Sequence, residues 1–181
     1  MLTPEQIAHF ETFGFLFMRQ VFSSEEIEKI TLEAEILWEE NRRSEAVSKN
    51  GISMDAFVER SPLLTELVDD DRIFHSVEQL LGSDFVWVGS EGNVTKNADH
   101  RWHSDRKCWR KEEEEDITYR RIKIMLYLDP VTKDTGCLRI IPGSHRMPFH
   151  QELGAQEKDA QSQPFGALGE DLPCHPLESE P

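Results

Sequence analysis

The dominant spacing of the hydrophobic residues in this chain changes near residue 84, and that change restricts the folds available to it. Before this point, apolar side chains such as Ile27, Ile30, Ala34 and Leu37 recur every three or four positions, which is the spacing of one helix face. After it they alternate with polar residues, most clearly over 121–128, as the two faces of a strand require. Helices followed by clustered strands predict an α+β domain whose β part is a sandwich or barrel.

Local signals set the expected element boundaries. Thr3 and Ser23 each precede a Gln or Glu by three positions, which is the pattern of a capping box. Helices are expected to start near Thr3, Ser23, Ser61 and Asp71, and three of them to end at Gly14, about Arg43 and Gly82. Strands are expected over 15–21, 85–88, 101–106, 121–128 and 137–141. We therefore expect one domain over 1–181, mainly helical over about 1–82, with barrel strands over 84–146 and irregular structure over 147–181.

The charge and cysteine content narrow the class of protein. Acidic residues outnumber basic ones by 35 to 20, and the formal net charge of −15 disfavours nucleic acid or an anionic membrane as a partner. The three cysteines, Cys108, Cys137 and Cys174, are odd in number and widely spaced, which fits a reducing compartment. The sequence shows neither a signal peptide nor a membrane-length apolar run, so we expect a cytoplasmic protein. No pattern indicates an oligomeric state.

A histidine and an aspartate two positions apart, His103 and Asp105, form the candidate metal site. In a strand both side chains leave the same face, whereas in a helix they would point about 200° apart. Two histidines and one carboxylate on one side of an Fe(II) ion leave three positions open for cosubstrate and dioxygen. By itself the tripeptide favours an ordinary surface histidine beside an acid, because it arises by chance in many proteins.

The surrounding motifs change that balance. The segment Trp102-His103-Ser104-Asp105, with Trp109 four residues later, resembles the metal-binding segment of the phytanoyl-CoA dioxygenase family, which includes ectoine hydroxylases. The resemblance extends from about residue 2 to the end of the chain. It is supported further by Leu2–Gln6, Phe13–Phe15, Tyr127–Pro130 and Gly136–His145.

The resemblance implies a double-stranded β-helix, a cupin-like jelly roll, that binds Fe(II) and 2-oxoglutarate and hydroxylates a small molecule. On this interpretation His103 and Asp105 are iron ligands, and the carboxylate at 105 favours hydroxylation over halogenation. Asn93 and Lys123 are candidate contacts to the oxoacid, although a strand lysine is more often exposed to solvent. Trp109 matches a family position beside the substrate, and packing of a loop onto the barrel explains it equally well.

The sequence also departs from the family. A further strand, a second metal-binding histidine and an oxoacid-binding arginine are not found, and about five strand candidates stand where a closed barrel needs roughly eight. The other histidines lie on expected helices, in irregular segments or at a turn, where His145 is expected to hydrogen-bond: His9, His75, His100, His145, His150 and His175. We therefore expect a C-terminally truncated member that is inactive by itself. A non-catalytic binding protein and a cupin-type enzyme that uses another metal remain alternatives, and the substrate is left open.

Overall fold

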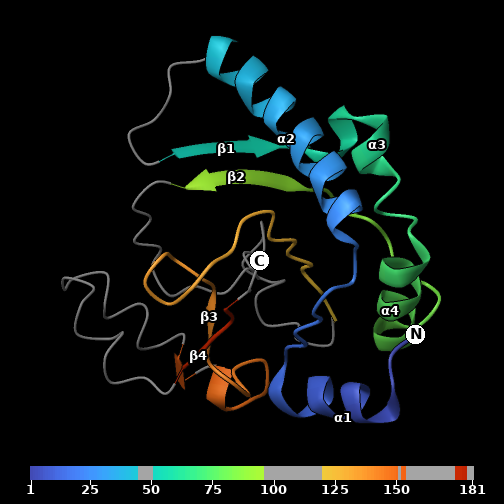
Figure 1. The fold of residues 1–181 in the computed structure, drawn as a ribbon. Helices are drawn as coiled ribbons and strands as arrows, with labels where there is room; N and C mark the ends of the chain where they lie inside the picture. The colour runs from blue at the N-terminus through green and yellow to red at the C-terminus, as the bar shows by residue number, and fades with distance from the viewer. Residues whose placement is uncertain (45–50, 96–119, 151, 154–173, 179–181) are drawn as a thin grey trace.

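The computed structural model describes residues 1–44, 51–95, 120–150, 152–153 and 174–178 (Figure 1). The bounded elements within them are four α-helices, one 3-10 helix and four short strands, and residues 149–150 and 152–153 are helical as well. The helices are α1 (Pro4–Phe13), α2 (Ser24–Ser44), α3 (Pro62–Thr65) and α4 (Asp71–Leu81), and the 3-10 helix is η1 (Val58–Arg60). The strands are β1 (Gly51–Asp55), β2 (Glu91–Thr95), β3 (Arg139–Ile140) and β4 (His175–Pro176). The predicted α+β class is confirmed at this level.

The four expected helices are all present, and local capping explains why. The Thr3 hydroxyl accepts a hydrogen bond from the Gln6 backbone N–H (3.3 Å), and the Gln6 side chain accepts one from the Thr3 backbone N–H (2.8 Å). Ser23 and Glu26 make the same reciprocal pair at the start of α2. Gly14 ends α1 with φ of 81°, a left-handed conformation that glycine adopts without a Cβ clash.

A charged cluster ties α2 to the start of α4. The Arg72 guanidinium donates to Glu26 Oε1 and to Asp70 Oδ2, both at 2.7 Å, and its Cζ lies 4.3 Å from the centre of the Phe22 ring. Hydrogen bonds from Arg72, and then from Ser23, lower the pKa of Glu26 from its ordinary value of 4.5 to about 2. Because the charged carboxylate is the bonded form, this cluster joins two helices most strongly when Glu26 is ionised.

The strands form two separate two-stranded antiparallel sheets. In the first, the register of β1 on β2 runs from Gly51 opposite Thr95 to Asp55 opposite Glu91. In the second, Ile140 of β3 lies opposite His175 of β4. Neither sheet of the described residues is closed, so they do not by themselves form the expected jelly roll.

The main hydrophobic core lies between the helices and one face of the β1–β2 sheet. Figure 1 shows α2 crossing beside this sheet, with α3 next to it. The Phe57 ring stacks on Trp38 of α2, with centroids 5.2 Å apart and planes at 22°. The buried members of this core are Phe22, Ile30, Ala34, Met54, Phe57 and Leu64.

Within the described residues, no helix combines the length and apolar character that a membrane crossing requires.

Three expected strands are wrong. Residues 15–21, 85–88 and 121–128 carry no strand in the structure. Alternation allows an extended backbone, but a strand also needs a neighbour that pairs with its N–H and C=O groups. In the second of these segments Val86 and Val88 are 80% and 92% exposed, so their apolar side chains do not face a core. The expected strand over 101–106 lies outside the described residues.

The last described segment also differs from expectation. Irregular structure was expected over 147–181, but β4 lies there and pairs with β3, within the strand expected over 137–141. His175, expected in an irregular segment, is therefore on a strand. The Glu178 side chain continues this attachment by accepting a hydrogen bond from the Lys133 backbone N–H (2.8 Å). Pro176 lies within this strand and Pro173 lies two residues before it, and a proline-rich sequence gives little strand signal.

The end of α1 docks on a turn that lies far along the chain. The Gly143 backbone N–H donates to the Phe13 carbonyl at 2.9 Å, and His145 Nε2 lies 3.4 Å from the Glu11 carbonyl oxygen. The expected hydrogen bond of His145 at this turn is thus confirmed. A Cβ on Gly14 would overlap the His145 ring, so the two segments approach closely only because residue 14 is glycine.

Candidate functional site

The two candidate metal ligands lie outside the described residues, as does Trp109, but the strand that leads toward them is described. Thr95, the last residue of β2, precedes His103 by eight positions. β2 is thus the described strand that precedes the candidate ligands in the sequence.

Asn93 lies in the middle of β2, on the sheet face away from the helical core. Directly opposed residues in an antiparallel pair share a face, and Asn93 is opposite Ser53. Both are exposed, whereas Met54 and Gly92, which are opposite each other on the other face, are buried. The Ser53 hydroxyl donates to Glu91 Oε1 at 2.7 Å, so this outer face is polar and hydrogen-bonded. The face of β2 that carries Asn93 is therefore polar and exposed.

The carboxylate of Glu59 fixes the position of the segment that leads into β2. Glu59 accepts hydrogen bonds from the Trp87 indole N–H (2.8 Å) and from the Ser90 hydroxyl. That hydroxyl in turn accepts from the Val58 backbone N–H (2.8 Å). Burial acts to raise the pKa of Glu59, but the hydrogen bonds from Ser90 and Trp87 outweigh it, and the pKa is lowered. The entry to β2 is thereby held on η1 by an ionised side chain.

Lys123 is less well placed than expected. It is exposed, and the segment that contains it is not a strand, so the expected alternation into a barrel is not observed. The segment is attached near its end, where the Leu138 backbone N–H donates to the Tyr127 hydroxyl at 2.9 Å and Leu128 packs against the main core. The structure does not bring Lys123 and Asn93 into one sheet.

The histidines that the structure describes have structural surroundings. His9 and His75 lie on α1 and α4, as expected. His150 Nδ1 lies 3.0 Å from the Ser144 carbonyl oxygen, and the His175 ring stacks on Phe15 with centroids 5.8 Å apart. In the described part of the chain, no group of three or more His, Cys, Asp or Glu could hold a metal ion.

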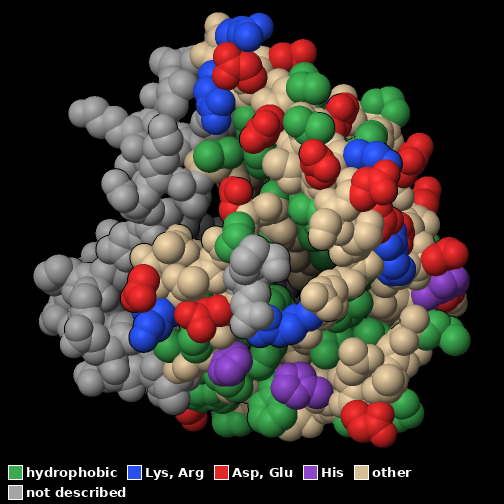
Figure 2. All heavy atoms as spheres, viewed as in Figure 1, with side chains coloured by type: hydrophobic (Ala, Val, Ile, Leu, Met, Phe, Trp, Pro, Cys, Tyr) green, Lys and Arg blue, Asp and Glu red, His purple; other side chains and the backbone are tan. Residues whose placement is uncertain are grey.

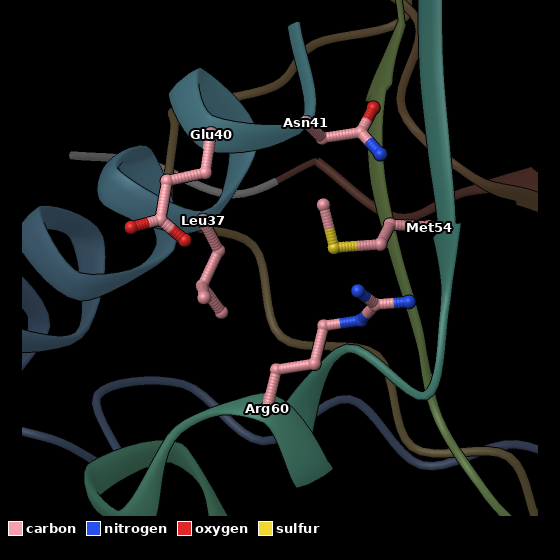
Figure 3. A pocket seen from close by; sticks show the side chains of 5 residues that line it. All are labelled: Leu37, Glu40, Asn41, Met54 and Arg60. Atoms are coloured by element: carbon pink, nitrogen blue, oxygen red, sulfur yellow. The ribbon is translucent and has the colours of Figure 1, made fainter. Parts of the chain in front are cut away.

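The structure also contains a hollow that the sequence pattern did not indicate. It measures about 350 Å³ and opens between α2 and β1 (Figure 3). Met54 faces it from the helix side of the sheet, the side opposite Asn93, and Arg60 points toward it while donating to the Asp55 carbonyl at 3.1 Å. Its lining comes from three elements and could not be read from one segment: Leu37, Glu40, Asn41, Met54 and Arg60.

Comparison with known proteins identifies the family of the chain. The family described as Phytanoyl-CoA dioxygenase (PhyH) matches residues 10–178, a span that includes β2 and both candidate metal ligands. The chain belongs to the phytanoyl-CoA dioxygenase family, as the motif around His103 and Asp105 predicted. The family is one of Fe(II)- and 2-oxoglutarate-dependent oxygenases.

Individual relatives give the same result. The chain is 30% identical to an ectoine dioxygenase of Bordetella bronchiseptica over 172 residues, which cover 90% of the chain and 55% of the relative. It is 30% identical over 156 residues to one from Streptomyces coelicolor (81% and 52% covered), and 28% identical over 165 residues to one from Nocardia farcinica (86% and 55%). The chain thus spans about half the length of the curated relatives it matches. No solved structure matches it significantly.

Proposed function

We propose that this protein is an Fe(II)/2-oxoglutarate-dependent dioxygenase that hydroxylates a small molecule. The observation that carries the proposal is the family match over residues 10–178, which includes the His103-Ser104-Asp105 segment. Imidazole and carboxylate are the donors of the two-histidine, one-carboxylate iron site. When bound, iron with dioxygen supplies the oxidising chemistry, and the protein orients the substrate and excludes competing reactions.

The described residues support particular roles in this proposal. Asn93 projects from the polar face of β2, where its amide N–H groups can donate to a carboxylate of the oxoacid. Glu59 holds the start of this strand through hydrogen bonds from Trp87 and Ser90. It thereby fixes the position of the strand that carries Asn93. Lys123 is proposed as a charge partner for the same oxoacid, and Trp109 as a contact to the substrate.

A jelly roll is the finer proposal for the fold. The β1–β2 sheet is covered by helices on one face and carries polar residues on the other, as a barrel wall with an inner binding face would. In this proposal 121–128 is a further wall segment whose alternating residues acquire a strand partner in the complete barrel. The second metal-binding histidine and the oxoacid-binding arginine are then contributed from outside the described residues, because His9, His75, His145, His150 and His175 already have structural surroundings.

Metal binding tests the proposed ligands directly. Anaerobic calorimetric titration with Fe(II) should show weak binding to the 181-residue chain, and His103→Ala or Asp105→Ala should reduce the affinity by at least about 100-fold, since loss of even an outer hydrogen-bond partner reduces it about 10–100-fold. His145→Ala is the matched control, because that ring lies beside the Glu11 carbonyl instead. Equal Fe(II) affinity in the wild type and both ligand variants would refute the assignment and favour a non-catalytic binding protein.

Turnover tests the reaction. The curated relatives are named ectoine dioxygenases, so ectoine is the first substrate to try, with succinate release as the readout. We expect no release from the 181-residue chain alone, since an imidazole and a carboxylate do not complete the three-ligand iron site. Release at an enzymic rate from this chain would contradict the incomplete site while supporting the dioxygenase assignment.

A further inference from the structure

One face of α2 carries an ordered series of side chains that are exposed among the residues that the structure describes. The helix presents Ile30 and Ala34 to the core, but its opposite side has its own regular spacing. The residues of this outer stripe are separated by steps of four, three, four, three and four positions: Glu25, Lys29, Leu32, Ile36, Glu39 and Arg43. At 100° per residue they occupy an arc of about 80° on the side away from the core. Such alternating steps are the spacing of a helix-to-helix contact seam.

The centre of the outer stripe is apolar and solvent-exposed. Leu32 and Ile36 are 55% and 53% exposed, and they lie one turn apart on the same side of the helix. Single exposed apolar residues are ordinary on protein surfaces. Two of them at the middle of a seam, with charged residues on both sides, are a more specific arrangement. Figure 1 shows α2 at the edge of the fold.

The outer stripe of one molecule is complementary in charge to the same stripe of a second molecule that runs in the opposite direction. We consider two copies of α2 packed antiparallel, with the two-fold axis at the level of Ala34. In this arrangement residue i of one helix faces residue 68 − i of the other. Leu32 then faces the partner's Ile36, Lys29 faces the partner's Glu39, and Glu25 faces the partner's Arg43. All three kinds of contact are favourable, and each occurs twice, as a two-fold axis requires.

Existing ion pairs would be extended rather than broken by this arrangement. Lys29 already contacts Glu25 at 2.8 Å, and Arg43 contacts Glu39 at 3.3 Å within the same helix. In the antiparallel pair these become two four-charge networks, one at each end of the apolar centre. Figure 2 shows acidic and basic side chains interspersed over this end of the molecule, in agreement with a surface of mixed sign.

We propose that the outer stripe of α2 is the contact surface of a homodimer in which α2 packs antiparallel against α2 of a second copy. The apolar pair supplies the desolvated centre, and the charges set direction and register, since exposed ion pairs contribute mainly to specificity. A parallel pairing in register would place Lys29 against Lys29 and Glu39 against Glu39. The same charges that favour the antiparallel pair therefore disfavour the parallel one.

Sedimentation equilibrium of the 181-residue protein is the first test. We expect a monomer–dimer equilibrium, and Leu32→Glu combined with Ile36→Glu should weaken it at least about tenfold, because four carboxylates would meet at the centre. Glu35→Lys is the matched control, since Glu35 is exposed on α2 but outside the stripe. A protein that stays monomeric up to about 1 mM, or a dimer unchanged by the double substitution, would overturn the proposal.

A charge-exchange experiment tests the antiparallel register independently of the apolar pair. Lys29→Glu alone places Glu against the partner's Glu39, and Glu39→Lys alone places Lys against the partner's Lys29, so each variant should dimerise at least about tenfold more weakly than the wild type. An equimolar mixture of the two variants restores opposite charges at both contacts, and should form heterodimers with near wild-type affinity. Circular dichroism verifies that each variant is folded. A mixture no more associated than its components would show that these residues do not meet.

Discussion

Replacing Gly92 by alanine should destabilise the protein through one identifiable collision. Gly92 is buried on the core face of β2, and a Cβ on it would overlap Cγ and Cδ2 of the Phe57 ring and lie 2.7 Å from its Cδ1. The ring cannot move freely, because it also stacks on Trp38. The added methyl group must therefore displace either the ring or the strand.

The magnitude follows from two opposing effects. Overpacking a filled core costs about 1–3 kcal/mol. Removing a glycine reduces the freedom of the unfolded chain and returns about 0.4–1 kcal/mol. The free energy of unfolding should fall by about 1–2 kcal/mol, which corresponds to a decrease of about 2–8 °C in Tm for a chain of this size.

Urea unfolding followed by tryptophan fluorescence measures the effect. Asn93→Ala is the matched control in the same strand, because it alters an exposed side chain on the other face and should change stability by less than about 0.5 kcal/mol. In a Phe57→Ala background, itself about 3–5 kcal/mol less stable, the same Gly92→Ala change should be neutral or stabilising. A Gly92→Ala protein as stable as the wild type, or an equal penalty in both backgrounds, would refute the collision.

Two further predictions concern the attachments of α2. Hydrogen bonds from Arg72 lower the pKa of Glu26 to about 2, so its stabilising contribution is present above its ordinary pKa of 4.5 and is lost as the pH falls toward 2. Glu26→Gln should therefore flatten the pH dependence of the urea midpoint between about pH 4.5 and 2, and a variant that keeps the wild-type slope there would contradict this assignment. Ser61, 2% exposed, donates to Glu33 Oε1 at 2.5 Å and caps α3, so Ser61→Ala should lower the free energy of unfolding by about 0.5–2 kcal/mol. Ser53→Ala, an exposed serine in β1, is its control and should change stability by less than about 0.5 kcal/mol; equal losses in the two variants would argue against a special role for the cap.

The helices could be predicted because their signals are local. Thr3 with Gln6, and Ser23 with Glu26, satisfy N–H groups within one turn, so the boundary is contained in four consecutive residues. Strands depend on a distant partner. β1 and β2 pair across about forty residues. The only sequence signal for them is a weak alternation in β1, where the apolar Ile52 and Met54 lie on either side of Ser53. Segment 121–128 shows the converse, since stronger alternation without a described partner gives no strand.

The candidate site was predictable to a different extent for each residue. The motif around His103 and Asp105 identified the family, since a metal-binding tripeptide and its flanking turns lie close together in sequence. Asn93 required knowledge of β2, which no local pattern supplied, yet the strand places it on the polar face. Lys123 was placed by alternation alone, and because 121–128 is not a strand in the structure, alternation no longer supports its orientation. The roles of all these residues remain predictions for the experiments above.

The docking of α1 on the turn at Gly143 sets an order of events during synthesis. The Phe13 carbonyl and its donor are separated by about 130 positions, so at about 5–20 residues per second the ribosome takes on the order of 10 s to supply the second partner after the first. During that interval α1 can be capped and coiled but has no turn to hold its end. The contact that holds the end of α1 therefore forms only after a segment about 130 residues further along the chain has been synthesised.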